Sequence, residues 1–463
     1  MAITDTLNSL LQVKEDIKWE LEQKGQTMND VYSTYPTAIN NLQTIQKNKT
    51  IQDCLYDDIV FVDYDGTIVA SYTIAQANAL TALPTPPTHS GLTFYGWNWT
   101  LEDLQSITYP LNVGAIYNTT DGKTHVFLEV PDFNCSPAEE FTMTLTMIPD
   151  ANNQFTIDWG DGSTVTTVSG TASTASTISH NYVGGTYEVL IDSTQTFSLG
   201  NGTSATTFIT GTVYPYVKKI FFGTTCRRAT AYGCYNLRGC EIISLSSNTT
   251  TLGNQYALSQ NYSLKQLILP IGSGTIANYG CAYNYNCEIV CLARTNTTLN
   301  QYSFTGNYCI QRFIIPDKIT SLNGNALYMS NALGLGVAAM HYFRGPKIAT
   351  FAQAMTMTFP LRKFAIGTGV TTMNSNLGDS TSYLTSITIP STVTSLGSSF
   401  RFPKNVYSII MLNSTPPTIT SNGIGSVGSS TRIFVPSGSV DTYKGASQWS
   451  TKSSQIYPIV ASS

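Results

Sequence analysis

The sequence predicts a mainly β, multidomain protein whose largest part is a solenoid built from stacked repeats. A short phrase recurs between residues 217 and 411, and most copies begin 22 to 24 residues apart. Apolar and polar residues alternate within each phrase, as in a short strand with one buried face. Only 11% of the residues are charged, whereas Ser, Thr, Asn, Gly and Tyr, which short strands and turns need, are abundant. One such strand cannot bury its apolar side alone, so the copies are expected to stack into a continuous core.

The repeat register follows from three clear copies, which are Leu264–Pro270, Ile310–Pro316 and Leu384–Pro390. In each copy a second apolar residue comes twelve positions after the start. The same two features place weaker copies that begin at Val217, Cys240, Cys287, Leu361 and Val406, with an irregular copy near Ala339. The fourth residue of each copy is expected to point into the core, and the third is expected to point outward. The expected core column contains Leu267, Phe313, Phe364 and Ile387.

Residues 1–48 form the first predicted segment, in which residues 4–24 have the pattern of an amphipathic helix. One stripe of this helix holds the candidate docking residues Leu7, Leu10, Leu11, Ile17 and Leu21. Such a stripe packs either on its own chain or on a partner. The Leu10-Leu-x-x-Lys14 pattern, followed by Lys24-Gly25, resembles the N-terminal helix of tail and fibre proteins from phages of gut bacteria. The resemblance implies that this segment docks onto other virion proteins or supports a homo-oligomer.

Residues 49–132 form the second predicted unit, a β-grasp-like module. Residues 59–72 have the pattern of a strand, an Asp65-Gly66 turn and a second strand. Further along, Phe94, Gly96 and Trp97 match the Phe-x-Gly-Trp ending of internalin B-repeat modules, which this unit resembles. Trp97 and Trp99 form either a ligand platform or part of the module core, and the core is the expected place.

Residues 133–195 form the third predicted unit. Its centre is Trp159-Gly-Asp-Gly162, and His180-Asn-Tyr182 follows in a later strand. These residues resemble the PKD-type immunoglobulin-like β-sandwich, which implies a buried Trp159 and a hydrogen-bonded His180. Asp158 and Asp161 alone fall short of the six to eight oxygens that Ca²⁺ takes, so they are expected to shape turns.

Residues 196–429 hold the repeats, and residues 430–463 are expected to cap them. The copy from Leu384 to Leu396 matches the pattern of BspA-type leucine-rich repeats position for position, and the repeats resemble that family. Residues 433–449 resemble the terminal cap of the same family. The resemblance implies a leucine-rich-repeat solenoid, and the same order of modules is familiar in gut-bacterial surface proteins and phage structural proteins.

The nine cysteines follow no metal-binding or disulfide pattern. The repeat register places Cys240 and Cys287 in the start column, where other copies have Val, Leu or Ile. Cys234 and Cys281 lie six residues before the starts, again at apolar positions. These four thiols are therefore expected to act as small core residues, and neither a metal nor a cofactor is predicted.

Two polar columns accompany the repeats. Three asparagines lie three residues before a start and are expected to form a hydrogen-bonded ladder, namely Asn261, Asn284 and Asn307. The residues that follow them are expected to stack along one edge, namely Tyr262, Tyr285 and Tyr308.

Glu241 and Glu288 are the closest approach to a catalytic pair in the repeats. Two strand spacings would separate them by about 9.6 Å, which approaches the distance between the carboxylates of an inverting glycosidase. Lys265 lies between them and would hold both carboxylates ionised, so neither makes a good acid. A salt-bridge ladder is predicted instead, and the protein is not expected to be an enzyme.

The charge of the chain is divided unevenly. Residues 1–216 hold 6 Lys and Arg against 23 Asp and Glu, whereas residues 217–429 hold 15 against 4. The basic repeats favour an anionic partner, and no nucleic-acid motif accompanies them. No apolar stretch is long enough to insert into a membrane, and the N-terminus lacks the pattern of a signal peptide.

These features predict a phage virion fibre or decoration protein on the particle surface, attached by its N-terminus and recognising a host-surface glycan or protein through its repeats. Cations beside outward aromatic rings suit an anionic glycan. The candidate binding residues are Lys219, Phe221, Arg312, His341, Phe343 and Lys363. Alternatively, another subunit covers this apolar stripe. A bacterial cell-surface leucine-rich-repeat adhesin is the second interpretation of the chain, and a polysaccharide depolymerase is the third.

Overall fold

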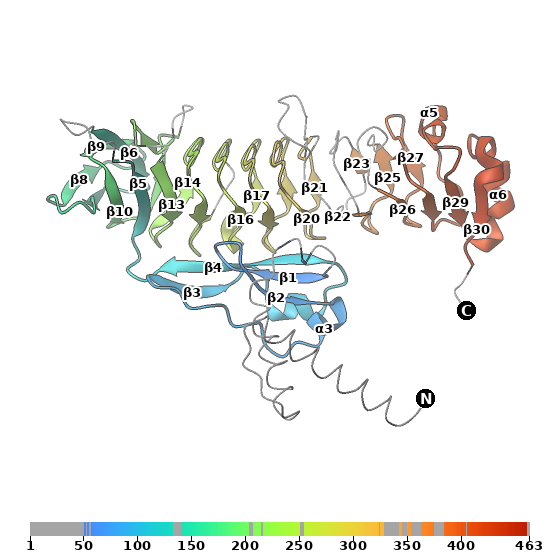
Figure 1. The fold of residues 1–463 in the computed structure, drawn as a ribbon, viewed down its shortest axis with the longest axis horizontal. Coiled ribbons are helices and arrows are strands. Elements are labelled where there is room, and N and C mark those ends of the chain that lie inside the picture. Colours follow the sequence, from blue (N-terminus) through green and yellow to red (C-terminus); the bar gives the residue numbers. More distant parts are fainter. Residues whose placement is uncertain are drawn as a thin grey trace, which may run out of the picture.

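The computed structural model describes residues 51, 53–54, 57–132, 140–202, 207–213, 216–250, 254–323, 325–327, 342–344, 350–352, 363–374, 384–403 and 405–460. For residues 321, 342–344, 350–352 and 363 it describes the backbone alone. The predicted docking helix and its five stripe residues lie outside the described residues. The described parts form a long solenoid with a β-sandwich at one end, a cap at the other and a small module against one side (Figure 1).

The small module, residues 57–119, is a four-stranded sheet with two short helices. Its strands are β1 (Ile59–Val62), β2 (Ile68–Tyr72), β3 (Leu92–Trp97) and β4 (Leu111–Thr119), in the order β2-β1-β4-β3. The helices α3 (Ile74–Asn78) and α4 (Leu101–Gln105) each begin at a threonine capping box. Trp97 packs edge-on against Phe61, and Trp97 and Trp99 are both buried, which confirms their expected place in the core.

The β-sandwich consists of two sheets. One contains β5 (Thr124–Val130), β7 (Asn153–Asp158), β8 (Thr166–Gly170), β10 (Gly185–Ser193) and the repeat strands β13 (Val217–Phe221) and β15 (Ile242–Ser244), in the order β15-β13-β5-β10-β7-β8. The other contains β6 (Phe141–Pro149), β9 (Ser176–Tyr182), β11 (Phe197–Leu199), β12 (Ile209–Thr210) and β14 (Cys226–Ala229). Residues 124–130 were expected to belong to the unit 49–132, but β5 pairs with β10 and β13 of the sandwich sheet.

One corner of the β-sandwich is organised around Trp159. Trp159 is buried, and the His180 ring stacks on it at 4.6 Å with an interplanar angle of 10°. His180 also lies 2.7 Å from Asp161, as a hydrogen-bonded histidine should. Asp158 and Asp161 accept hydrogen bonds from the backbone amides of Gly160 and Ser163, so both carboxylates shape turns as expected.

The main strand series of the solenoid contains one strand for each of the nine expected repeat starts. They are β13 (Val217–Phe221), β15 (Ile242–Ser244), β16 (Gln266–Ile268), β18 (Ile289–Cys291), β20 (Arg312–Ile314), β22 (Tyr342–Arg344), β24 (Lys363–Ala365), β26 (Ser386–Ile389) and β28 (Ser408–Met411). Neighbouring strands pair in parallel, but the strand pairing is interrupted between β15 and β16 and again between β24 and β26. The core column Leu267, Phe313, Phe364 and Ile387 is buried, which confirms the repeat register.

A second series of short strands runs along the solenoid on another side. It contains β17 (Thr275–Ile276), β19 (Thr298–Leu299), β21 (Ser321–Leu322), β23 (Thr350–Ala352), β25 (Thr372–Asn374) and β27 (Ser395–Leu396). The 3₁₀ turn η4 (Ile271–Ser273) precedes the first of these strands.

Both ends of the solenoid core are closed. At the first end, β13 pairs antiparallel with β5, and one hydrophobic core continues from the sandwich into the repeats. At the other end, β29 (Arg432–Val435) and β30 (Ile456–Pro458) extend the sheet. The helices α5 (Ser421–Gly425) and α6 (Val440–Gly445) and the 3₁₀ segments η5 (Ser437–Ser439) and η6 (Trp449–Gln455) complete this cap around buried Trp449. Terminal closure is what a repeat array needs to hide its last apolar faces.

Ladders of identical side chains hold successive repeats together. Asn284 Oδ1 accepts from the Asn261 amide (2.9 Å), while Asn307 Oδ1 accepts from the Asn284 amide (2.7 Å), which confirms the predicted asparagine ladder. The expected tyrosine stack is also present, with Tyr285 centred 4.7 Å from Tyr262.

A second tyrosine stack was not expected from the sequence. Tyr232, Tyr256, Tyr279 and Tyr302 stack at 4.7 to 4.8 Å, each with a positive φ near 57° that side chains rarely adopt. The stacking and the turn hydrogen bonds around it hold these four tyrosines in the left-handed region. None of the described helices has the length and apolar character needed to cross a membrane.

Candidate functional site

The outer face of the main strand series, defined by the side chains that point away from the repeat core, carries the candidate binding residues. Along β16, β18 and β20 this face is not free. The small module lies against it, with β4 beside β16 and β18 (Figure 1). Ile268, Ile289 and Cys291 of the repeats form one buried cluster with Val60, Val62 and Ile116 of the module. The apolar stripe is therefore covered by the same chain.

Gly114 of β4 marks the closest approach of the two parts. A Cβ atom at this position would lie 2.3 Å from Ile268 Cγ2 and 3.0 Å from Cys291 Cβ, well inside van der Waals contact. Only a residue without a side chain lets the two sheets meet here.

Side-chain amides of the module satisfy backbone carbonyls at the ends of the repeat strands. Asn98 Nδ2 donates to the carbonyls of Leu269 (3.1 Å) and Cys291 (3.2 Å). Trp99 Nε1 donates to the Leu292 carbonyl (2.8 Å), and Asn112 Nδ2 donates to the Val290 carbonyl (3.1 Å). Buried polar groups without such partners would cost free energy, so these bonds make the docking specific.

Arg312 was expected to meet an anionic ligand, and this expectation is wrong. Its side chain points outward from β20 but is fully buried beneath the module. The guanidinium donates to the backbone carbonyls of Cys54, Asp57, Asp58 and Leu111. A planar group with five donors suits such a cluster of carbonyl oxygens, so Arg312 is an internal docking residue.

The other five candidate binding residues are either covered by the chain, exposed to solvent, or without a described side chain. Phe221 is 7% exposed and packs against Phe127 and Tyr64, so it is also covered by the chain. Lys219 is exposed on β13. His341 lies outside the described residues, and Phe343 and Lys363 are described by their backbone alone. The structure therefore does not bring the six residues together as one ligand surface.

The outer face is open at the other end of the solenoid, on β26, β28, β29 and β30. One cross-strand row of this face contains Thr388, Ile410, Phe434 and Tyr457. Tyr457 is 41% exposed, its ring lies 6.2 Å from that of Phe434, and the Arg432 guanidinium lies 5.7 Å from its centre. We call this row, with Arg432 and Leu412, the open platform.

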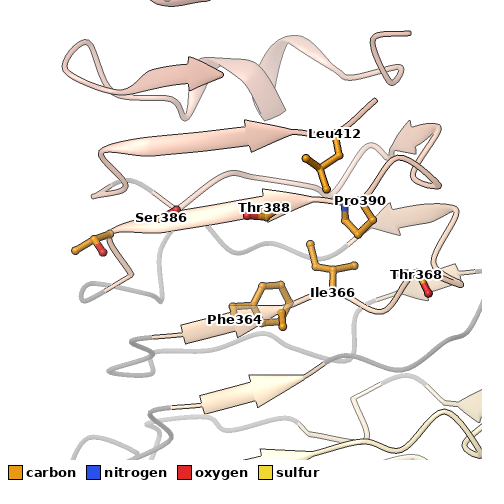
Figure 2. A pocket seen from close by; sticks show the side chains of 9 residues that line it. Phe364, Ile366, Thr368, Ser386, Thr388, Pro390 and Leu412 are labelled. Carbon is orange, nitrogen blue, oxygen red and sulfur yellow. The ribbon is translucent and has the colours of Figure 1, made fainter. Parts of the chain in front are cut away.

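A cavity of about 450 Å³ adjoins the open platform, at the interruption between β24 and β26. Figure 2 shows Ile366 and Leu412 pointing toward each other from opposite sides of this cavity, with Pro390 beside them. Ile366 occupies a repeat position that is fully buried at Leu269 and Ile389, yet here it is partly exposed. The missing strand pairing opens the outer face at this place, and the periodic sequence gives no signal of it.

The comparison with protein families matches residues 216–334 and 350–446 to the BspA type leucine rich repeat region, in six copies. The repeats are BspA-type leucine-rich repeats. The predicted resemblance is thereby confirmed for this part of the chain. The comparison with curated proteins gives no match.

Three solved structures are similar to the chain over about half of its length. A leucine-rich repeat protein from Bacteroides ovatus has 15% identity over 53% of this chain and 85% of its own, with a TM-score of 0.20. A leucine rich cell surface protein from Faecalibacterium prausnitzii has 15% identity over 55% and 94%, with a TM-score of 0.22. The pneumococcal vaccine antigen PcpA has 9% identity over 52% and 78%, with a TM-score of 0.21. Because these TM-scores are so low, the family match alone supports the assignment.

Glu241 and Glu288, the two carboxylates considered above as a catalytic pair, have structural partners. Lys265 Nζ lies 2.5 Å from Glu241, and this hydrogen bond lowers the pKa of Glu241. Glu288 instead accepts a hydrogen bond from the neutral Gln311 amide (3.2 Å), so the predicted salt-bridge ladder is present only in part, at the Lys265–Glu241 pair. Burial raises the pKa of Cys240 and Cys281 to about 12, as expected of inert core thiols.

The three described histidines each bind a carboxylate in the two N-terminal units. His89 lies 2.7 Å from buried Asp63, His125 lies between Glu188 and Asp121, and His180 binds Asp161. Among the described residues, no group of three or more His, Cys, Asp or Glu is arranged to hold a metal ion.

Proposed function

We propose that this protein is a non-enzymatic recognition protein displayed on a biological surface, and that the open platform is its ligand-binding side. One observation carries the proposal. The small module covers the outer face along β16 to β20, while the same face stays exposed along β26 to β30 and keeps large apolar side chains there. Exposed apolar and aromatic groups on a stiff repeat sheet are typical of recognition surfaces.

The BspA-type repeats support the recognition role, because each repeat adds one strand to an extended display surface. The site of display is either a virion, as the sequence features favour, or a bacterial cell surface. The comparisons lend no support to the phage origin, and both sites accommodate the same solenoid. Attachment through residues 1–48 and assembly as a homo-oligomer remain part of the proposal. Immunogold labelling of purified particles and of producing cells separates the two sites.

A binding assay with the purified full-length protein tests the recognition role. Tyr457→Ala removes the most exposed ring of the open platform, and we expect it to reduce binding to host cells at least fivefold. Tyr95→Ala is the matched control, because Tyr95 is also a strongly exposed tyrosine, but on the small module. Equal binding by the wild type and both variants would place the ligand elsewhere.

The non-enzymatic part of the proposal has its own test. Host polysaccharide incubated with the protein should release no new reducing ends over many hours. Steady release that grows with protein concentration would show a depolymerase instead.

A further inference from the structure

We propose that the cavity between β24 and β26 binds an uncharged saccharide unit of the surface glycan. This inference rests on the proposed recognition function and names the ligand class of the same face. The volume of the cavity, about 450 Å³, lies within the range of small-molecule sites, about 300 to 1,000 Å³. The cavity opens on the outer face, beside the exposed Leu412 of the open platform.

One part of the cavity wall is apolar. Ile366 comes from the β24 side, where Phe364 of the buried core column also borders the cavity, and Pro390 and Leu412 come from the far side (Figure 2). A pyranose ring presents C–H groups on its faces, and such faces pack well against aromatic and aliphatic side chains. Because Leu412 is 47% exposed, a sugar that covers it gains the free energy of burying apolar surface.

Another part of the wall carries hydroxyl groups. Ser386 and Thr388 stand on β26, and Thr368 follows β24. Each hydroxyl both donates and accepts hydrogen bonds, which matches the hydroxyls of a sugar. None of the nine lining residues carries a charge, so the cavity has no group that would compensate a sulfate, phosphate or carboxylate. This distinguishes it from the anionic site expected from the sequence.

An extended peptide fits the same place less well. Residues of β24 and β26 have Cα atoms within 8 Å of each other, although no hydrogen bonds join the strands. Inserting a strand would require two spacings, or about 9.6 Å between β24 and β26. The cavity therefore has room for a compact ligand on the outer face, but a peptide strand cannot be inserted between β24 and β26.

The open platform lets a longer glycan continue beyond the cavity. Leu412 lines the cavity, and Ile410, Phe434 and Tyr457 follow on the adjacent strands. Tyr457 lies three strand spacings from Thr388, or about 14 Å across the sheet. The cavity would hold one sugar unit and the aromatic row would support its neighbours, so affinity should rise with chain length.

Isothermal titration of the full-length protein with defined oligosaccharides tests the ligand class. The panel contains uncharged gluco-, galacto-, manno- and N-acetylglucosamine oligomers of two to six units, together with sialylated and sulfated oligomers. We expect an uncharged oligomer to bind with a Kd that changes less than twofold between 0.05 and about 0.5 M salt, because no ion pair is formed. Binding of charged oligomers alone, weakened strongly by salt, would overturn the inference.

Two substitutions connect that binding to the cavity. Thr388→Val keeps the side-chain shape and removes one hydroxyl, so the Kd should rise about tenfold for the loss of a hydrogen bond. Ala365→Phe fills the cavity and should abolish binding. Thr275→Val on β17 is the matched control, since Thr275 is an exposed threonine on the other strand series. Unchanged oligosaccharide binding by a folded Thr388→Val or Ala365→Phe protein would refute the cavity as the site.

The cell-binding assay separates this inference from the proposed function. If Tyr457→Ala weakens cell binding while both cavity variants bind cells and oligosaccharides normally, the recognition role survives and the cavity inference fails. If the wild-type protein binds no host cell and no oligosaccharide in the panel, both fail.

Discussion

Gly114→Ala is expected to separate the small module from the solenoid. The added methyl group would lie 2.3 Å from Ile268 Cγ2, whereas carbon atoms in good contact lie about 3.5 to 4.0 Å apart. Gly114 is fixed within its own sheet, because its amide donates to Asn98 Oδ1 (2.8 Å) and β4 pairs with both β1 and β3. The added methyl group would overlap Ile268 by more than about 1 Å, so the small module and the solenoid must move apart at this contact.

The cost follows from what must move. Overpacking a well-filled core costs about 1 to 3 kcal/mol, and the same displacement lengthens the hydrogen bonds from Asn98 to the carbonyls of Leu269 and Cys291. We expect about 2 to 3 kcal/mol less docking free energy, or roughly a 30- to 150-fold larger open fraction.

Hydrogen exchange with mass spectrometry measures this change. Peptides that cover residues 264–293 should exchange faster in Gly114→Ala than in the wild type, while peptides from the cap should not change. Gly438→Ala is the control, because a Cβ at that position meets no atom within 4 Å. The same control measures how much a Gly→Ala change stabilises the folded protein by lowering the conformational entropy of the unfolded chain. If Gly114→Ala shows wild-type exchange over 264–293, the close approach does not limit docking and the reasoning fails.

Three further predictions concern single groups. Arg312→Leu should reduce stability to urea by about 2 kcal/mol or more, because four carbonyls, two of them fully buried, lose a charged donor; unchanged unfolding would mean that docking does not depend on it. Asn284→Ala should cost about 3 kcal/mol, because the Asn261 amide and the carbonyls of Leu258 and Cys281 lose their side-chain partner, while the exposed Asn286→Ala should cost under about 0.5 kcal/mol, both measured by urea unfolding. Burial opposes ionisation of Asp161, but hydrogen bonds, including one from His180, lower its pKa from 3.8 to about 2. Its ionised form therefore stabilises the fold above pH 3.8, and this stability is lost as the pH falls toward 2. Asp161→Asn should show a smaller drop in urea midpoint over that interval, and an identical drop would contradict the assignment.

The repeat architecture was accessible from the sequence because it is determined locally. Side chains alternate with a period of two along a strand, so the phrase at Leu384 already separates core from outer positions. Equal spacing then brings like residues together, which is why the ladder at Asn284 and the thiols at Cys240 and Cys287 were correctly assigned. The stack at Tyr256 was missed although its tyrosines recur at the repeat spacing, because they lie in a left-handed turn outside the strand phrase on which the register was built.

Only the tertiary structure determines which part of the outer face is covered by the small module and which part stays open. An outward Arg312 has the same strand position whether it meets solvent, a ligand or another part of the chain. The carbonyl of Cys54 that it contacts is 258 residues away, and the amide of Asn98 reaches a carbonyl 171 residues away. No local pattern encodes such a meeting, since it depends on how two folded parts fit, at Gly114 above all. Periodicity determines which side of a repeat faces outward, whereas the shape and hydrogen-bonding groups of the docked module determine which part of that side remains open.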